Sequence, residues 1–237
     1  MLQFLGIGGA FSVDLGNTSA FYKKENELFL LDCGEDVFGN ILKNHLLEGV
    51  TKINILITHF HSDHVGSLGT LVFYCDASNL EEINIVFPNR EKLVELIRQF
   101  GIQNCNINIY TPKEFARLKI KEYRQEHDVI EAYGYIIKLD GKTIYYSGDT
   151  KSLPDEVFAL LIKGKIDYFF QDVRLKQNPY HLSLEELESK IPFNLRKQIN
   201  CMHFVSEAEI NEVTEHGFSR VRRFESEEKN GNIKSSK

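Results

Sequence analysis

The stretch THFHSDHVGS, residues 58–67, places three histidines and an aspartate within six residues, directly after the apolar run INILI. His59 and His61 are two residues apart, so on an extended segment their side chains point the same way and can hold one ion. Asp63 and His64 follow where we expect the strand to turn into a helix, and there they can bind a second ion. A chance run of surface histidines is the alternative, and the core strand before the motif argues against it. Because imidazoles and carboxylates are ligands of zinc and similar divalent ions, the stretch predicts a metal site.

Two ions need further ligands, and three polar residues end later segments of the chain. His127 ends KEYRQEH, Asp149 ends TIYYSGD, and His203 ends INCMH. Taken singly, they could be a loop histidine, a helix N-cap and a satisfied buried histidine, respectively. Together with the first cluster they supply enough ligands for two coordination spheres, so we expect all three at the site. His45 and His216 lack such neighbours and are interpreted as surface residues.

Short apolar runs alternate with helical patterns along the chain. We expect strands at 2–7, 19–24, 27–32, 53–58, 83–87, 106–110, 166–172 and 199–204, and helices at 35–47, 65–77, 90–100, 154–163, 183–191 and 206–216. Within residues 133–149, Asp140-Gly141 lies between two β-rich runs, which predicts a hairpin with a two-residue turn. Mixed strands and helices with polar clusters at strand ends predict a layered α/β sandwich with its helices outside.

The composition suits a single globular domain. The chain has 237 residues, of which 42% are hydrophobic and 26% are charged. One α/β domain over residues 1–224 is expected. Residues 225–237 are polar and lack periodicity, so they are expected to form a disordered tail.

The charge argues against a polymeric nucleic acid as partner. The formal net charge is −6, and the one basic run, RVRR at 220–223, is short enough for a solvated strand end. Proteins that bind tRNA or DNA usually carry a basic excess or a basic stripe.

Cysteine usage and the first residues predict a cytoplasmic protein that does not enter a membrane. The four cysteines form no C-x-x-C pair, which is typical of buried thiols in a reducing compartment. The apolar start MLQFLGIGG lacks a basic segment and is too short to span a bilayer, so it is expected to form a core strand.

The ordered set of motifs resembles the metallo-β-lactamase superfamily. It comprises H-x-H-x-D-H, a lone histidine, YSGDT and a strand-end histidine, and it extends from GIGGAFS near Gly6 to His203. The resemblance implies a four-layer αβ/βα sandwich with the site at one edge of the paired sheets. It also implies two divalent metal ions per chain, with zinc expected and manganese as the alternative. By motif, one ion would be held by His59, His61 and His127, the other by Asp63, His64 and His203, and Asp149 would bridge them.

Three local features, YGY, YSGDT and HLS, are similar to the ribonuclease Z branch of the superfamily. His181 in PYHLSLEEL matches a histidine that lies near the metals in that branch. The resemblance implies that it protonates the leaving alkoxide or binds phosphate, and we expect Asp63 to be catalytic as well. Alternatively, His181 is only a neighbour of Ser183, which would cap a helix. Asn17 belongs either to a phosphate-side loop or to a turn.

The chain departs from the tRNA-processing members in one respect. They carry a long arm between the third histidine and the bridging aspartate, whereas here the Asp140-Gly141 turn closes that interval. A small anionic phosphodiester is therefore the expected substrate. GIGGAFS, LGNTSAF, LFLLDCGE and ITHFHSDHVGSLG are similar to compact phage-type cyclic-nucleotide phosphodiesterases of the anti-Pycsar type. This implies hydrolysis of 3′,5′-cyclic nucleotides to linear mononucleotides, countering a cyclic-nucleotide immune signal in the host cytoplasm if the protein is viral.

The resemblance to these compact phosphodiesterases implies a homodimer. The expected helix over residues 65–77 has apolar and aromatic side chains that suit a subunit interface, although the same residues could be core.

Other functions stay open on the sequence alone. A ribonuclease Z-like tRNA or RNA 3′ endonuclease would be favoured by a basic surface stripe. A thioester or lactone hydrolase of the same fold would not need His181. A metal-binding protein without activity is disfavoured by the complete ligand set.

Overall fold

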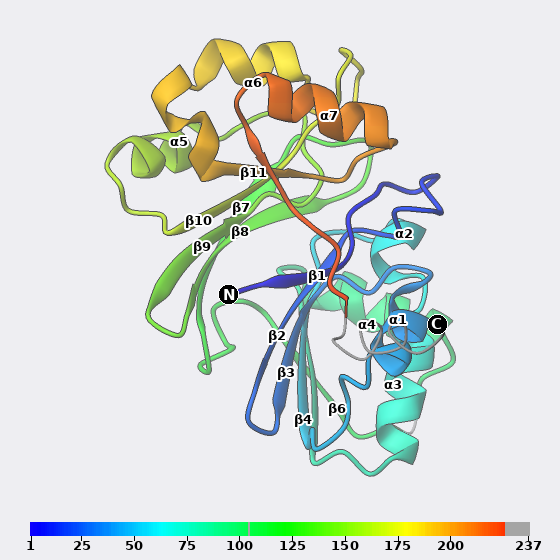
Figure 1. The fold of residues 1–237 in the computed structure, drawn as a ribbon. Helices are drawn as coiled ribbons and strands as arrows, with labels where there is room; N and C mark the ends of the chain where they lie inside the picture. The colour runs from blue at the N-terminus through cyan, green and yellow to red at the C-terminus, as the bar shows by residue number, and fades with distance from the viewer. Residues whose placement is uncertain (104, 226–237) are drawn as a thin grey trace, which may run out of the picture.

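The computed structural model describes residues 1–103 and 105–225. In this part of the chain, two six-stranded sheets pack face to face, and helices cover their outer faces (Figure 1). This arrangement is the four-layer αβ/βα sandwich that the sequence predicts. The predicted tail, apart from Glu225, lies outside the described residues, and the assignment of 1–224 to a single domain stays a prediction.

The first sheet contains the N-terminal strands. In spatial order they are β1 (Gln3–Gly6), β2 (Ser19–Lys24), β3 (Glu27–Leu31), β4 (Lys52–Leu56), β5 (Glu82–Val86) and β6 (Ile107–Tyr110). The first three strands are antiparallel, and β3 to β6 run parallel. The helices of this half are α1 (Val37–Lys43), α2 (Ser62–Val65), α3 (Leu68–Ala77) and α4 (Arg90–Gln99), and Figure 1 shows α1, α3 and α4 on the outer side.

The second sheet contains the C-terminal strands. In spatial order they are β12 (Ser219–Arg220), β11 (Ile199–Met202), β10 (Tyr168–Asp172), β9 (Lys142–Tyr146), β8 (Ala132–Leu139) and β7 (Lys119–Gln125). Strands β9 to β12 run parallel, and β7 and β8 are antiparallel to their neighbours. The helices of this half are α5 (Asp155–Ile162), α6 (Leu184–Lys190), α7 (Glu207–Glu215) and the 3₁₀ helix η1 (Phe193–Gln198).

Alternation along the buried strands explains why a sandwich forms. In β3, Leu28 and Leu30 pack with the helices of the first half, whereas Phe29 and Leu31 pack into the core between the sheets. Successive side chains of a strand point to opposite faces, so a strand that is apolar at every position needs a partner layer on both sides. The helices supply one layer and the second sheet supplies the other.

The parallel strands bring the site together. In each sheet, neighbouring parallel strands end at the same edge, and the segments that follow β4, β9 and β11 carry six of the seven predicted ligands. The seventh, His127, follows the antiparallel edge strand β7. Ligand sites of open α/β sheets lie at the carboxyl ends of such strands. The two sheets therefore present their polar strand ends toward one common region.

Most elements agree with the predictions within a few residues, and the differences have local causes. The helix expected over 65–77 is divided into α2 and α3, and Asp63 and His64 lie in the first of them. The sequence does not predict strand β7, because KIKEYRQ is mostly charged, as edge strands often are. The hairpin prediction is confirmed: Asp140 and Gly141 both have positive φ, 52° and 75°, and Leu139 pairs with Lys142.

Two further expectations concern the environment of the chain. Within residues 1–103 and 105–225, no helix has the length and apolar character needed to cross a membrane. All four cysteines are free thiols, and Cys33, Cys75 and Cys201 are buried as predicted.

Candidate metal centre

A buried carboxylate holds the first motif against the neighbouring strand. Asp32 directly follows β3 and is completely buried. Its side chain accepts hydrogen bonds from the Thr58 amide at 2.7 Å, from the Thr58 hydroxyl at 2.9 Å and from Nδ1 of His64 at 3.0 Å. This set of bonds keeps a proton on Nδ1 of His64, so Nε2 is the nitrogen that can bind a metal ion.

The first two histidines of the motif are oriented in a similar way. The Thr58 hydroxyl, which donates to Asp32, accepts from Nδ1 of His59 at 3.0 Å. The ring of His61 is turned the other way, because its Nε2 lies 3.4 Å from the Asp128 carboxylate. Nε2 of His59 and Nδ1 of His61 are therefore the nitrogens left for a metal ion.

Histidines from later segments also have one nitrogen occupied. Nδ1 of His127 donates to the carbonyl oxygen of Tyr180 at 3.0 Å. Nδ1 of His203 lies 3.4 Å from Oδ1 of Asp172, a buried carboxylate at the end of β10. In both residues, Nε2 faces the interior of the site.

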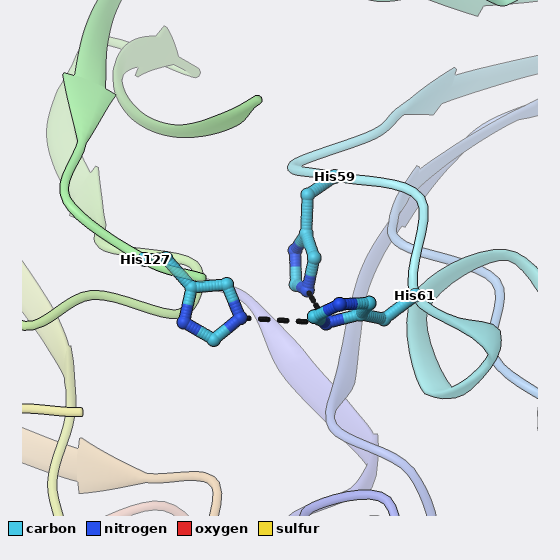
Figure 2. Close-up of side chains that lie close together, drawn as sticks. All are labelled: His59, His61 and His127. Carbon is cyan, nitrogen blue, oxygen red and sulfur yellow. Dashed lines mark hydrogen bonds between the residues drawn. The ribbon is translucent and has the colours of Figure 1, made fainter. Parts of the chain in front are cut away.

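The inner nitrogens of His59, His61 and His127 form one compact group (Figure 2). Nε2 of His59 lies 3.1 Å from Nδ1 of His61, and Nε2 of His127 lies 3.4 Å from the same atom. Nitrogens bound at 2.0–2.1 Å to a tetrahedral zinc ion are about 3.3 Å apart. The separations thus match a shared ion.

A second group contains Asp63, His64, Asp149 and His203, all of them buried. Nε2 of His64 lies 3.4 Å from carboxylate oxygens of both Asp63 and Asp149. Nε2 of His203 lies 3.3 Å from Asp63 and 3.5 Å from Asp149. Among the described residues, Nε2 of His64 has no hydrogen-bond partner, although it is buried. A buried nitrogen without a partner, lying between two carboxylates, fits a cation site.

Asp149 lies between the two groups. One oxygen, Oδ1, faces His64 and His203, while Oδ2 is 3.9 Å from His59 and 3.7 Å from His127. Burial alone would raise the pKa of this carboxyl, but the charges of His203 and His64 hold its pKa well below the usual range. The N-cap alternative is wrong, since α5 starts after Pro154 and not at Asp149.

The electrostatics favour positive charge in the second group. Burial would lower the pKa of His203, but Asp149 outweighs it and raises the pKa to about 9. Asp149, Asp63 and Asp32 likewise raise the pKa of His64 well above its ordinary value, against the effect of burial. His59 faces mainly other histidines, and burial holds its pKa well below the ordinary value. Protons and divalent ions would thus compete for the second group.

His181 lies beside both groups. Its Nδ1 donates to Oδ2 of Asp172 at 2.7 Å, and its ring centroid is 5.2 Å from that of His127 and 5.3 Å from that of His203. The alternative role of this segment is also present: Ser183 caps α6 in a reciprocal capping box with Glu186. The cap fixes the start of the helix, and His181 extends from it into the site.

The groups open into a cavity of about 440 Å³. Its lining includes His61, Asp63, His127, Asp149, His181 and His203 together with Arg174 and residues of the loops that follow β1 and β11. This volume lies within the range of small-molecule sites, which is about 300–1,000 Å³.

Sequence reasoning missed several residues that support the site. Asp32 and Asp172 each stand at the end of a buried strand, the same signal that pointed to Asp149. Asp128 and Arg174 carry no sequence signal of this kind, because their roles depend on how the two sheets meet.

Three polar residues singled out by the sequence are not members of the histidine groups. Asn17 exchanges hydrogen bonds with Asp36, at 3.1 Å and 3.3 Å, which supports the turn interpretation. His45 and His216 pair with nearby glutamates outside the cavity, as expected of surface histidines.

The donor set predicts about two transition-metal ions per chain, since two groups of ligands share one carboxylate. Protein purified without chelator and reconstituted with zinc or manganese should approach this value in elemental analysis. His61→Ala should lower the metal content, whereas the control His216→Ala should not. A reproducible value of one ion or less in the reconstituted wild type would contradict a two-ion site.

Comparisons with known proteins agree with this geometry. The family model of the anti-Pycsar protein Apyc1 matches residues 1–225. An anti-Pycsar protein Apyc1 from Paenibacillus sp. (strain J14) is 27% identical over 226 residues, covering 88% of this chain and 90% of the relative. Another, from Bacillus phage BSP38, is 26% identical over 232 residues, covering 86% and 88%.

Solved structures show the same fold. The metallo-β-lactamase fold protein YhfI from Bacillus subtilis superimposes with a TM-score of 0.70 at 16% identity, and the match covers 95% of this chain and 96% of that one. Together with the buried groups of histidine and aspartate, these findings confirm the predicted fold and the predicted class, a metal-dependent hydrolase. The chain belongs to the family of the anti-Pycsar protein Apyc1.

Proposed function

We propose that the protein is a di-metal phosphodiesterase that opens 3′,5′-cyclic nucleotides to linear mononucleotides and thereby removes a cyclic-nucleotide immune signal. The observation that carries the proposal is His181, which is held by Asp172 and lines the same cavity as the two predicted metal-binding groups. Family membership over residues 1–225 supports the choice of substrate.

A phosphodiester needs a nucleophile on one side and a proton for the leaving oxygen on the other. When bound, the two ions would neutralise charge on the phosphoryl oxygens and make water acidic enough to attack at neutral pH. His181 suits the donation of a proton to the leaving oxygen. Because Asp172 occupies its Nδ1, Nε2 is the nitrogen that can give a proton to the departing ribose oxygen.

Asp63 would act on the other side of the phosphorus. Its carboxylate lines the cavity and lies beside Nε2 of His64 and of His203. Burial alone would raise the pKa of Asp63, but His64 and His203 outweigh burial and lower the pKa, so the carboxylate is ionised. In that form it can orient the attacking water and accept its hydrogen bond.

The rim of the cavity suits a nucleobase. Phe11 is 98% exposed and Tyr180 is 47% exposed, and both line the cavity that contains His181. Stacking on aromatic side chains stabilises a bound base by about 1–3 kcal/mol and accepts every base, because each has a π-face. Since the chemistry takes place at the phosphate, we expect both purine and pyrimidine rings to be tolerated.

The competing activities have less support. A tRNA 3′ endonuclease of this branch would need the arm, and the β8–β9 hairpin closes that interval with the two residues Asp140 and Gly141. The net charge of −6 also disfavours a polyanionic partner. A thioester hydrolase would not need a proton donor fixed like His181, because a thiolate leaves without protonation.

Three finer points belong to the same proposal. Zinc is the preferred metal and manganese the alternative, because the donors are mainly imidazoles. A homodimer is supported by α3, on which Phe73 and Tyr74 are 46% and 41% exposed, and the mass of the protein in solution tests it. The compartment would be the cytoplasm, as the buried thiols suggest.

The substrate is tested by chromatography of cyclic CMP, UMP, AMP and GMP after incubation with metal-loaded protein. Each should be converted to a linear mononucleotide, and a precursor tRNA in parallel should not be cleaved. His61→Ala serves as the inactive control. If no cyclic nucleotide opens faster than in this control while a thioester or lactone reacts, the phosphodiesterase assignment is wrong.

The role of His181 is tested by separating metal content from rate. His181→Ala should keep its metal and lose about 10²- to 10⁴-fold in rate, the usual contribution of general acid catalysis. The matched control His216→Ala, outside the cavity, should keep full activity. Loss of metal from the His181→Ala variant, or full activity in it, would overturn the assignment.

A further inference from the structure

Arg174 lines the cavity but has no role in the mechanism proposed above. It lies two residues beyond the end of β10, and its side chain lines the cavity next to His203. Among the described residues that line this cavity, it is the single lysine or arginine. A cation at this position can bind the phosphate group of a substrate if its N–H donors are available.

The donors of Arg174 are largely unused. A guanidinium has five N–H donors. Here Nη1 is buried without a hydrogen-bond partner among the described residues, and Nη2 contacts Nδ1 of His203 at 3.0 Å. The carboxylate of Glu209 is 3.9 Å away and already accepts the amides of Leu175 at 2.9 Å and Val205 at 2.6 Å. Because an underpaired charge at a cavity wall is unfavourable, an anion there would be stabilised.

The contact with His203 is compatible with only one tautomer. Arg174 can only donate, so the contact requires a bare Nδ1, and any state of His203 with a proton on Nδ1 removes this acceptor. A histidine that binds a cation through Nε2 carries its proton on Nδ1 instead. This N–H has an acceptor in place, because Oδ1 of Asp172 lies 3.4 Å away, is buried and lacks a hydrogen bond within the described residues. In the cation-binding tautomer, Nη2 of Arg174 therefore loses its acceptor and becomes available together with Nη1.

The loop after β1 leaves room for the guanidinium. A Cβ atom on Gly9 would lie 2.7 Å from Nη2 of Arg174 and 3.1 Å from Cε1 of His203. The backbone of this loop is held in place, because the Gly9 amide donates to the carbonyl oxygen of Phe204 at 2.9 Å. The absence of a side chain at this position thus keeps the end of Arg174 beside the cavity.

We propose that Arg174, whose buried Nη1 lacks a partner among the described residues, binds the non-bridging phosphoryl oxygens of the substrate through its two terminal nitrogens. The proposal rests on the phosphodiesterase function given above and adds a residue to it. An arginine fork suits phosphate because two parallel N–H donors match two oxygens, and it would balance charge on the phosphoryl group during attack.

The test is calorimetric titration of inorganic phosphate into metal-loaded protein. Arg174→Gln should bind phosphate about 10-fold or more weakly than the wild type, since a charge-assisted pair is lost. Arg174→Lys, which keeps the charge without the fork, should be intermediate. Arg98→Gln, a matched loss of charge at an exposed position of α4, should bind like the wild type. Elemental analysis should give the same metal content in all four proteins.

Several outcomes would overturn the proposal. Equal phosphate affinity in wild type and Arg174→Gln would do so, and so would a wild type that binds no phosphate in the millimolar range. Loss of metal from Arg174→Gln would assign the residue to the positioning of His203 instead. Phosphate binding needs no turnover, so a wild type that binds phosphate through Arg174 but opens no cyclic nucleotide would support the anion site and reject only the proposed activity.

Discussion

Two buried carboxylates orient the histidines on which the site depends. Asp32 fixes Nδ1 of His64, and Asp172 fixes Nδ1 of His181 and faces Nδ1 of His203. An imidazole has two nitrogens and one proton in its neutral form, so an acceptor on one side determines which lone pair faces the other side. Removing either carboxylate would leave rings that can turn or exchange tautomers, and the spacing that suits an ion would no longer be maintained.

The fold places these carboxylates where they are needed. Asp32 follows β3 in the first sheet, and Asp172 ends β10 in the second, both at the carboxyl edge of parallel strands. Packing the sheets face to face brings the two edges together, so each sheet supplies both ligands and the groups that orient them. The same construction leaves a cavity at the junction, with Arg174 on its wall and aromatic side chains at its mouth.

The sequence was sufficient to predict the sandwich and the seven residues that the structure gathers in two groups. Four of them lie in one short motif after a buried strand, and Asp149 and His203 end apolar segments, whereas His127 ends the charged segment KEYRQEH. Their roles as ligands stay a prediction. The residues that contact and orient the histidines are harder to predict from the sequence. Asp172 carries the same strand-end signal as Asp149, whereas Arg174 and Asp128 matter only through contacts between segments far apart in the chain. The composition of β7 does not indicate a strand, because its pairing with β8 is what stabilises the extended conformation.

The central claim is that acceptors outside the site determine the tautomer of every inward-facing histidine. Long-range ¹H–¹⁵N correlation spectra of the imidazole rings in zinc-loaded, ¹⁵N-labelled protein test it directly. The account predicts the proton on Nδ1 in His59, His64, His127 and His203, and on Nε2 in His61. A proton on Nδ1 of His61, or on Nε2 of the other four, would contradict it.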